Sequence, residues 1–141
     1  MGDTPTDFPD VPFMRELGAR LLGAADGQAQ VALELQPRHG NSWGVGHGGV
    51  VMALLDVAMA RAGRSLVERD GRLGVGSVTV EMKTSFFRPA RGTVVAHGRV
   101  LHRSTTMTYC EAELVDAGGV LVAKALGTIK FLTRPDAAQR L

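Results

Sequence analysis

One apolar segment constrains the fold of this chain more than any other feature of its sequence. The segment runs from Val50 to Ala60, and Asp56 is its one charged residue. A membrane span takes about 20 apolar residues, so a shorter run is expected inside a folded protein. Its alanine and methionine content, and its continuation to Glu68, favour a helix. Because this helix would be apolar on all sides, we expect other elements to surround it.

Four strand-like runs follow this segment and can surround it. Short turn-forming stretches, such as Pro89–Gly92 and residues 117–119, separate them. Loops of this length join neighbouring antiparallel strands, so we predict an antiparallel meander. An antiparallel β-sheet wrapped around one long central helix is an α+β fold. The predicted strands are Val75–Arg88, Thr93–Arg103, Met107–Asp116 and Val120–Leu132.

Two elements are predicted before the apolar segment. Apolar residues at near-helical spacing over Phe13–Ala25 predict a short amphipathic helix that ends at Gly27. From Gln28 the apolar residues alternate, which predicts a strand that stops at Pro37. We therefore divide the chain into an N-terminal arm with a short helix (1–27), one domain (28–133) and a C-terminal tail (134–141).

Composition excludes several classes of protein. The chain has 141 residues, enough for one domain. Its 16 basic and 14 acidic residues are scattered, whereas a protein that wraps duplex nucleic acid usually carries a dense basic stripe. The one cysteine cannot form an internal disulfide, and the polar, acidic N-terminus does not resemble a secretion signal. We expect a cytoplasmic protein with neither a nucleic-acid nor a membrane partner.

Two adjacent glycines, Gly48 and Gly49, stand where the predicted central helix begins. The first N–H groups of a helix lack partners within the helix and lie at the positive end of its dipole. An N–H group in this position can stabilise the oxyanion that forms when a carbonyl group is attacked. The alternative is that the glycines only permit close packing of the helix on the sheet.

Asp56 is the residue most informative about chemistry. It is the one charge between His47 and Arg61, and burying an unpaired carboxylate costs several kcal/mol. Two interpretations stand: a structural aspartate satisfied by hydrogen bonds, or a carboxylate that acts as general base or nucleophile.

Spacing limits how Asp56 and Gly48 can cooperate. They are eight residues apart, which is about 12 Å along a helix axis. One aspartate side chain cannot cover that distance. If both groups act on one carbonyl, Asp56 must come from a second subunit, which predicts a homodimer with two shared sites.

The glycine pair and Asp56 belong to a longer set of motifs: Asn41-x-x-Gly44-x-x-His47-Gly48-Gly49, Leu54-Leu55-Asp56, residues 78–82 and 87–90, and the strand from Gly119 to Gly127. In these motifs the sequence resembles the hotdog-fold acyl-CoA thioesterases of the 4-hydroxybenzoyl-CoA thioesterase superfamily, and in particular its phenylacetate-pathway branch. The resemblance covers roughly residues 30–132. It implies a hotdog fold, hydrolysis of an aromatic (phenylacetyl-type) or medium- to long-chain acyl-CoA, no cofactor or metal, and a homodimer or a dimer of dimers.

Three further residues are candidates at the site. Asn41 either holds the glycine loop or orients a thioester or water, and a loop asparagine is also a common turn former. His47 is either a general acid or base, or a residue that caps the helix. Thr79 matches a position where relatives carry a Ser or Thr that helps to hold the attacking water, and its alternative is a solvent-facing strand residue. We place it on a face with Ser77, Glu81 and Lys83.

Contacts with the coenzyme A part of the substrate are assigned to Gly49 and three arginines. Arg88, Arg91 and Arg103 border predicted turns and can meet phosphates, although solvated surface arginines are the alternative.

No metal site is predicted. We place His97 and His102 on opposite faces of a strand, which rules out a metal pair, and we interpret Cys110 as a small buried hydrophobe.

Two other functions compete with hydrolysis. One is an acyl-thioester hydratase or dehydratase on the same fold, whose usual histidine-based pattern this chain lacks. The other is a non-catalytic acyl-CoA-binding protein. Sensors of that kind carry a DNA-binding domain, which residues 1–27 are too short to supply.

Overall fold

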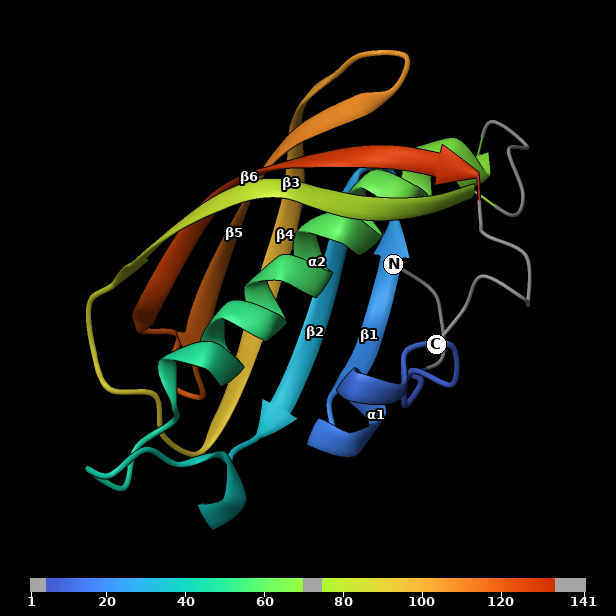
Figure 1. The fold of residues 1–141 in the computed structure, drawn as a ribbon. Helices are drawn as coiled ribbons and strands as arrows, with labels where there is room; N and C mark the ends of the chain where they lie inside the picture. The colour runs from blue at the N-terminus through green and yellow to red at the C-terminus, as the bar shows by residue number, and fades with distance from the viewer. Residues whose placement is uncertain (1–4, 70–74, 134–141) are drawn as a thin grey trace.

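The computed structural model describes residues 5–69 and 75–133. A curved, six-stranded antiparallel sheet wraps around one long helix, α2, as predicted for a hotdog fold (Figure 1). The sheet order is β1-β2-β4-β5-β6-β3. The elements are α1 (Pro12–Leu17), β1 (Arg20–Ala25), β2 (Gln28–Glu34), the 3₁₀ turn η1 (Pro37–His39), α2 (Gly48–Arg69), β3 (Val75–Phe86), β4 (Thr93–Arg103), β5 (Met107–Asp116) and β6 (Leu121–Thr133).

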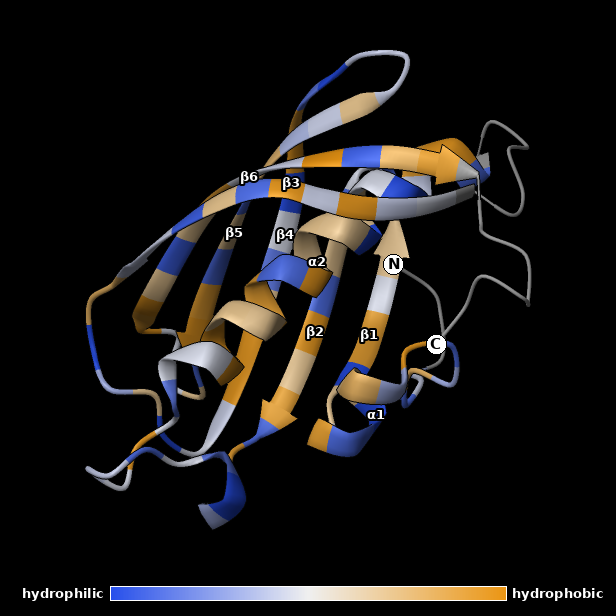
Figure 2. Cartoon of the chain, in the orientation of Figure 1, coloured by the Kyte–Doolittle hydropathy of each residue, from blue (hydrophilic) through white to orange (hydrophobic). Residues whose placement is uncertain are grey.

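Helix α2 confirms the expected central helix, and its sheet-facing side forms the core. Leu54, Leu55, Ala58 and Met59 are fully buried on that side. Strand β4 passes so close that a Cβ on Gly98 would lie 2.3 Å from the Ala58 carbonyl oxygen. Along the opposite side the residues are only half-buried in this single chain, so the sheet surrounds the helix incompletely. Figure 2 shows apolar and polar residues alternating along the strands.

The predicted helix over Phe13–Ala25 is wrong in its second half. Helix α1 ends where Gly18 adopts a left-handed conformation, with φ of 81°. The chain then forms β1, and a tight turn at Asp26 and Gly27, both with positive φ, reverses it into β2. Such a turn is typical of a two-residue hairpin. The leucines of this segment fit either periodicity, and the turn chemistry decides between them.

The predicted meander is correct for β4, β5 and β6 but wrong for β3. Strand β3 pairs with β6 at the edge of the sheet, while β4 pairs with β2. The connector of residues 87–92 crosses one end of the sheet instead of making a hairpin. Its backbone bonds the strands it passes: Phe87 N–H donates to the Val122 carbonyl at 2.8 Å, and Leu35 N–H donates to the Gly92 carbonyl at 2.9 Å.

A β-bulge in β3 changes which residues face the helix. Thr79 pairs with buried Ile129, but Glu81 pairs with the next residue back, Thr128, and accepts its hydroxyl hydrogen bond on the outer face. The extra residue between Thr79 and Glu81 reverses, from that point on, which residues of β3 face the helix and which face outward. The predicted common face of Ser77, Thr79, Glu81 and Lys83 is therefore wrong: the first two face α2, and the last two do not.

The N-terminal arm packs against the sheet and α2. Thr6 forms a two-bond bridge with Leu21 of β1, and Phe8 is fully buried. The predicted C-terminal tail, residues 134–141, lies outside the described residues. No described helix is both long enough and apolar enough to cross a bilayer.

Candidate active site

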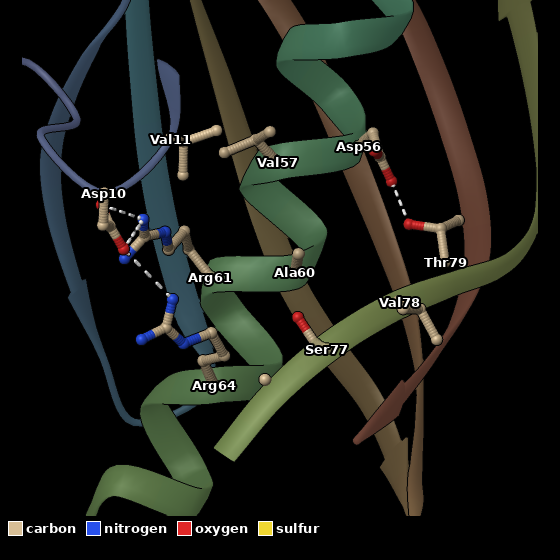
Figure 3. A pocket seen from close by; sticks show the side chains of 11 residues that line it. Asp10, Val11, Asp56, Val57, Ala60, Arg61, Arg64, Ser77, Val78 and Thr79 are labelled. Atoms are coloured by element: carbon tan, nitrogen blue, oxygen red, sulfur yellow. Dashed lines mark hydrogen bonds and ion pairs between the residues drawn. The ribbon is translucent and has the colours of Figure 1, made fainter. Parts of the chain in front are cut away.

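The site centres on a hydrogen bond between α2 and β3. Asp56 is half-buried on the side of α2 that the core does not use, and Thr79 faces it from β3 (Figure 3). The Thr79 hydroxyl donates a short hydrogen bond to Oδ1 of Asp56. Within residues 5–69 and 75–133, no other group hydrogen-bonds to the Asp56 carboxylate, so Oδ2 is available to a water or a substrate.

Asp56 and Thr79 open into a cleft of about 620 Å³. Figure 3 shows three walls: α2, the first half of β3, and the N-terminal arm. The α2 residues Val57 and Ala60 form an apolar strip between the carboxylate at one end and a charged cluster at the other. The lining residues are Asp10 and Val11 of the arm, Asp56, Val57, Ala60, Arg61 and Arg64 of α2, and Gly76 to Thr79 of β3.

The charged cluster joins the arm to α2, and sequence reasoning missed it. Both Asp10 carboxylate oxygens lie 2.8 Å from Nη2 of Arg61, and one lies 3.5 Å from Nη1 of Arg64. Arg61 also stacks over the ring of Phe8, 5.3 Å from its centroid. Partial burial acts to raise the pKa of Asp10, but the hydrogen bond and charge of Arg61 hold it below its usual value. The sequence signal that could have indicated this cluster is the presence of two arginines, Arg61 and Arg64, on the same predicted helix as Asp56.

The other candidate groups lie at the start of α2. His47 caps the helix, because its Nδ1 accepts the Gly49 N–H at 2.8 Å. Among the residues that the structure describes, none accepts a hydrogen bond from the Gly48 N–H. The Phe86 ring lies 3.6 Å from where a Cβ of Gly48 would stand. The two glycines therefore differ: the Gly49 N–H is hydrogen-bonded to His47, and the Gly48 N–H is available to a ligand.

Asn41 organises the loop that precedes this helix. Its Oδ1 accepts hydrogen bonds from the N–H groups of Trp43, at 2.9 Å, and Val45, at 3.3 Å. These bonds fix the turn over residues 41–45, which supports the loop-holding interpretation of Asn41.

The structure keeps Gly48 and Asp56 apart in one chain. Both lie on α2, separated by the expected distance of about 12 Å along its axis. The Asp56–Thr79 pair and the Gly48 N–H thus lie too far apart to act on one carbonyl within the same subunit.

The three predicted coenzyme A arginines do not gather in one place. Arg88 and Arg91 are exposed on the connector, which bonds the glycine loop through the Gly46 N–H and the Ala90 carbonyl at 2.8 Å. Arg103 is the last residue of β4, about 33 Å along the strand from Thr93, where the connector ends. The first two therefore lie near the start of α2, and Arg103 lies at the far end of the sheet.

No described residues form a group of three side chains suited to a metal ion. Cys110 is buried, and burial raises the pKa of its thiol. His97 lies 3.1 Å from the side-chain nitrogen of Gln30.

Known proteins resemble this chain over most of its length. Residues 44–123 match the family described as the thioesterase superfamily. A Saccharolobus solfataricus protein, provisionally named an esterase, is 31% identical over 79% of this chain and 77% of its own. The structure of a conserved Pseudomonas aeruginosa protein is 32% identical with a TM-score of 0.78, covering 86% of this chain and 94% of that one. A mutant of the phenylacetic acid degradation protein PaaI from Thermus thermophilus is 31% identical with a TM-score of 0.76, covering 86% and 100%.

Proposed function

This chain belongs to the thioesterase superfamily, and we propose that it is an acyl-CoA thioesterase with Asp56 as its general base or nucleophile. The observation that carries this proposal is the Asp56–Thr79 pair at the cleft. Thr79 orients the carboxylate through one oxygen and leaves the other oxygen accessible. A carboxylate held in this way can take a proton from water.

The proposed reaction needs both half-sites. A water bound at Oδ2 gives a proton to Asp56 as its oxygen attacks the thioester carbonyl carbon. The resulting oxyanion accepts a hydrogen bond from the N–H of Gly48 of the partner subunit. The carbon–sulfur bond then breaks, and the thiolate takes the proton from Asp56, which gives a free acid and coenzyme A. If Asp56 attacks directly, the carbon–sulfur bond breaks as an acyl anhydride forms on Asp56 and the thiolate leaves. Water then hydrolyses the anhydride, which gives the free acid, restores the Asp56 carboxylate and supplies the proton that the thiolate takes.

The partner subunit follows from geometry. About 12 Å along α2 separates Gly48 from Asp56, and one carbonyl cannot reach both. Strand β3 is one of the two edge strands of the sheet, exposes Val78 and Val80, and lies beside the half-buried side of α2. We propose a homodimer that completes each site across this region, with a dimer of dimers as the larger assembly.

Coenzyme A is proposed to lie near the start of α2 of the subunit that supplies Gly48, where Gly49, Arg88 and Arg91 are exposed. The guanidinium groups suit its phosphates. The acyl group would then extend into the cleft beside Asp56, and the resemblance suggests a phenylacetyl-type or a medium- to long-chain acyl group.

Thiol release from acyl-CoA tests this function. The purified protein is incubated with phenylacetyl-CoA and hexanoyl-CoA in the presence of a free-thiol reagent, beside an Asp56→Asn variant. We expect catalytic thiol release that the variant loses. Binding without thiol release would indicate a non-catalytic acyl-CoA-binding protein. Hydration of an enoyl-CoA without thiol release would indicate a hydratase, and either result would refute the proposal.

A further inference from the structure

Arg61 and Arg64 lie at the far end of the cleft, and they indicate which acyl group it binds. This inference rests on the proposed thioesterase function. Arg61 and Arg64 are nearly buried, with side chains 13% and 16% exposed, yet both line the cleft that holds Asp56. The carboxylate that pairs with both of them is Asp10, which is 38% exposed. Figure 3 shows these groups on one side of α2 and Asp56 on the other.

The guanidinium groups have more donors than the described acceptors satisfy. Nε of Arg64 is buried and has no hydrogen-bond partner among residues 5–69 and 75–133. Nη1 of Arg64 reaches Asp10 only at 3.5 Å, and its Nη2 is 3.1 Å from Glu68, which is half exposed. An unpaired buried donor is costly, more so in a charged group. The cluster therefore has unused hydrogen-bonding capacity, and one more anionic acceptor would meet it through the parts of Arg61 and Arg64 that line the cleft rather than through the buried Nε.

The position of this cluster relative to Asp56 fits an acyl chain. Five residues, or about 7.5 Å along the helix, separate Asp56 from Arg61. Helical side chains tilt toward the N-terminus, which brings the guanidinium of Arg61 back toward the level of Asp56. An acyl group whose carbonyl carbon lies at Asp56 would cross the apolar strip of Val57 and Ala60 before it meets the arginines.

We propose that Arg61 and Arg64 bind a carboxylate at the far end of the acyl group, so that the preferred substrates are ω-carboxyacyl-CoA thioesters. Arginine forks match carboxylate geometry and give selectivity as well as affinity. A methyl group at the same place would accept no hydrogen bond from either guanidinium and would add apolar surface beside two charges. Asp10 occupies part of the position that the substrate carboxylate takes.

A substrate pair that differs only at the chain end tests this specificity. The values of kcat/KM for adipyl-CoA and hexanoyl-CoA are measured with wild type, Arg64→Met and Asp10→Asn. The matched control is Arg99→Met, which removes an arginine paired with Glu111 on the outer face of the sheet. Circular dichroism establishes that each variant is folded.

The two cleft variants should change the adipyl-to-hexanoyl ratio in opposite directions. Wild type should prefer adipyl-CoA at least tenfold. Arg64→Met should lower the ratio tenfold or more, because a carboxylate partner is lost. Asp10→Asn should raise it, because a competing carboxylate is removed. Arg99→Met should leave the ratio as in wild type.

A purely structural cluster gives a different result. If the arginines only anchor the arm, both cleft variants would reduce turnover of the two substrates alike, and the ratio would stay constant. A constant ratio, or a wild-type preference for hexanoyl-CoA, would overturn this inference while leaving thioesterase function intact. Hydrolysis of neither substrate by wild type would instead count against the proposed function.

Discussion

At the residue scale, Asp56 and Thr79 define each other's environment. A carboxylate within an apolar helical segment needs a hydrogen-bond partner, and among the described residues Asp56 finds it in the Thr79 hydroxyl on an edge strand. The bulge after Thr79 keeps that hydroxyl on the helix-facing side, where simple alternation would put Glu81 on the same face. In the proposed site, the Asp56 carboxylate is therefore the reacting group, and the Thr79 hydroxyl orients it.

Asp56→Asn is expected to keep the fold and to lose most activity. The amide retains the size of the side chain and can still accept from Thr79, but it cannot take a proton from water. Loss of a general base lowers the rate by about 10²–10⁴-fold. The measurement is kcat on purified, folded protein, with Asp7→Asn, an exposed carboxylate of the arm, as control. Turnover within a few-fold of wild type would refute the role of Asp56.

Thr79→Ala is expected to have a milder effect. The variant removes one hydrogen bond to the carboxylate, worth about 1–1.5 kcal/mol, which corresponds to a tenfold loss of kcat or less. Steady-state kinetics on the same substrate gives the comparison. A loss as large as that of Asp56→Asn would assign Thr79 a direct part in the chemistry.

At the scale of elements, the sequence predicted most of the strands and the central helix, because period and turn residues are local signals. Strands β4 and β5 match their predicted bounds. The end of the short N-terminal helix and the place of β3 in the sheet could not be predicted in this way. The first depends on the left-handed conformation of Gly18, and the second depends on long-range backbone bonds of the connector. The Asp10–Arg61 pair joins residues 51 positions apart, so no local sequence pattern predicts it.

The close contact of β4 with α2 makes Gly98 sensitive to substitution. A Cβ there would lie 2.3 Å from the Ala58 carbonyl oxygen, so Gly98→Ala forces backbone to move. Overpacking of this kind lowers the free energy of unfolding by about 1–3 kcal/mol. Urea unfolding would measure it, with Gly118→Ala as control, because a Cβ there makes only an ordinary contact at 3.4 Å. Equal stability of the two variants would contradict the close approach.

A charge network across β4, β5 and β6 predicts pH-dependent stability. The hydrogen bond from Arg99, with help from Lys124, lowers the pKa of Glu111 below its usual value of 4.5. A lowered folded-state pKa means that the network stabilises the protein above pH 4.5 and loses this effect as pH falls further. Glu111→Gln should therefore lower the urea midpoint near pH 7, and its difference from wild type should shrink near pH 3. A difference that is the same at both pH values would exclude this linkage.

At the scale of the whole molecule, the proposed homodimer takes one half of each of its two sites from each subunit. The Asp56–Thr79 pair lies midway along α2, the free Gly48 N–H lies at its start, and about 12 Å of helix keeps them apart. The sequence predicted this separation, because helical spacing fixes it. Which surfaces would meet in the proposed dimer could not be predicted, because they depend on the shape of β3 and the half-buried side of α2.

Mixed dimers test this two-subunit site most directly. Asp56→Asn and Gly48→Val subunits, each inactive alone and carrying different tags, are reassembled and the heterodimer is purified. A Cβ at Gly48 makes only ordinary contact with the Phe86 ring, at 3.6 Å, so the Gly48 variant should fold, as circular dichroism and size-exclusion chromatography must show. In the heterodimer one shared site collects both substitutions and the other is wild type at both positions. The heterodimer should therefore recover about half of the wild-type thioesterase activity. A heterodimer that forms but stays inactive would contradict the shared site, because a site built from one chain carries a defect in each subunit.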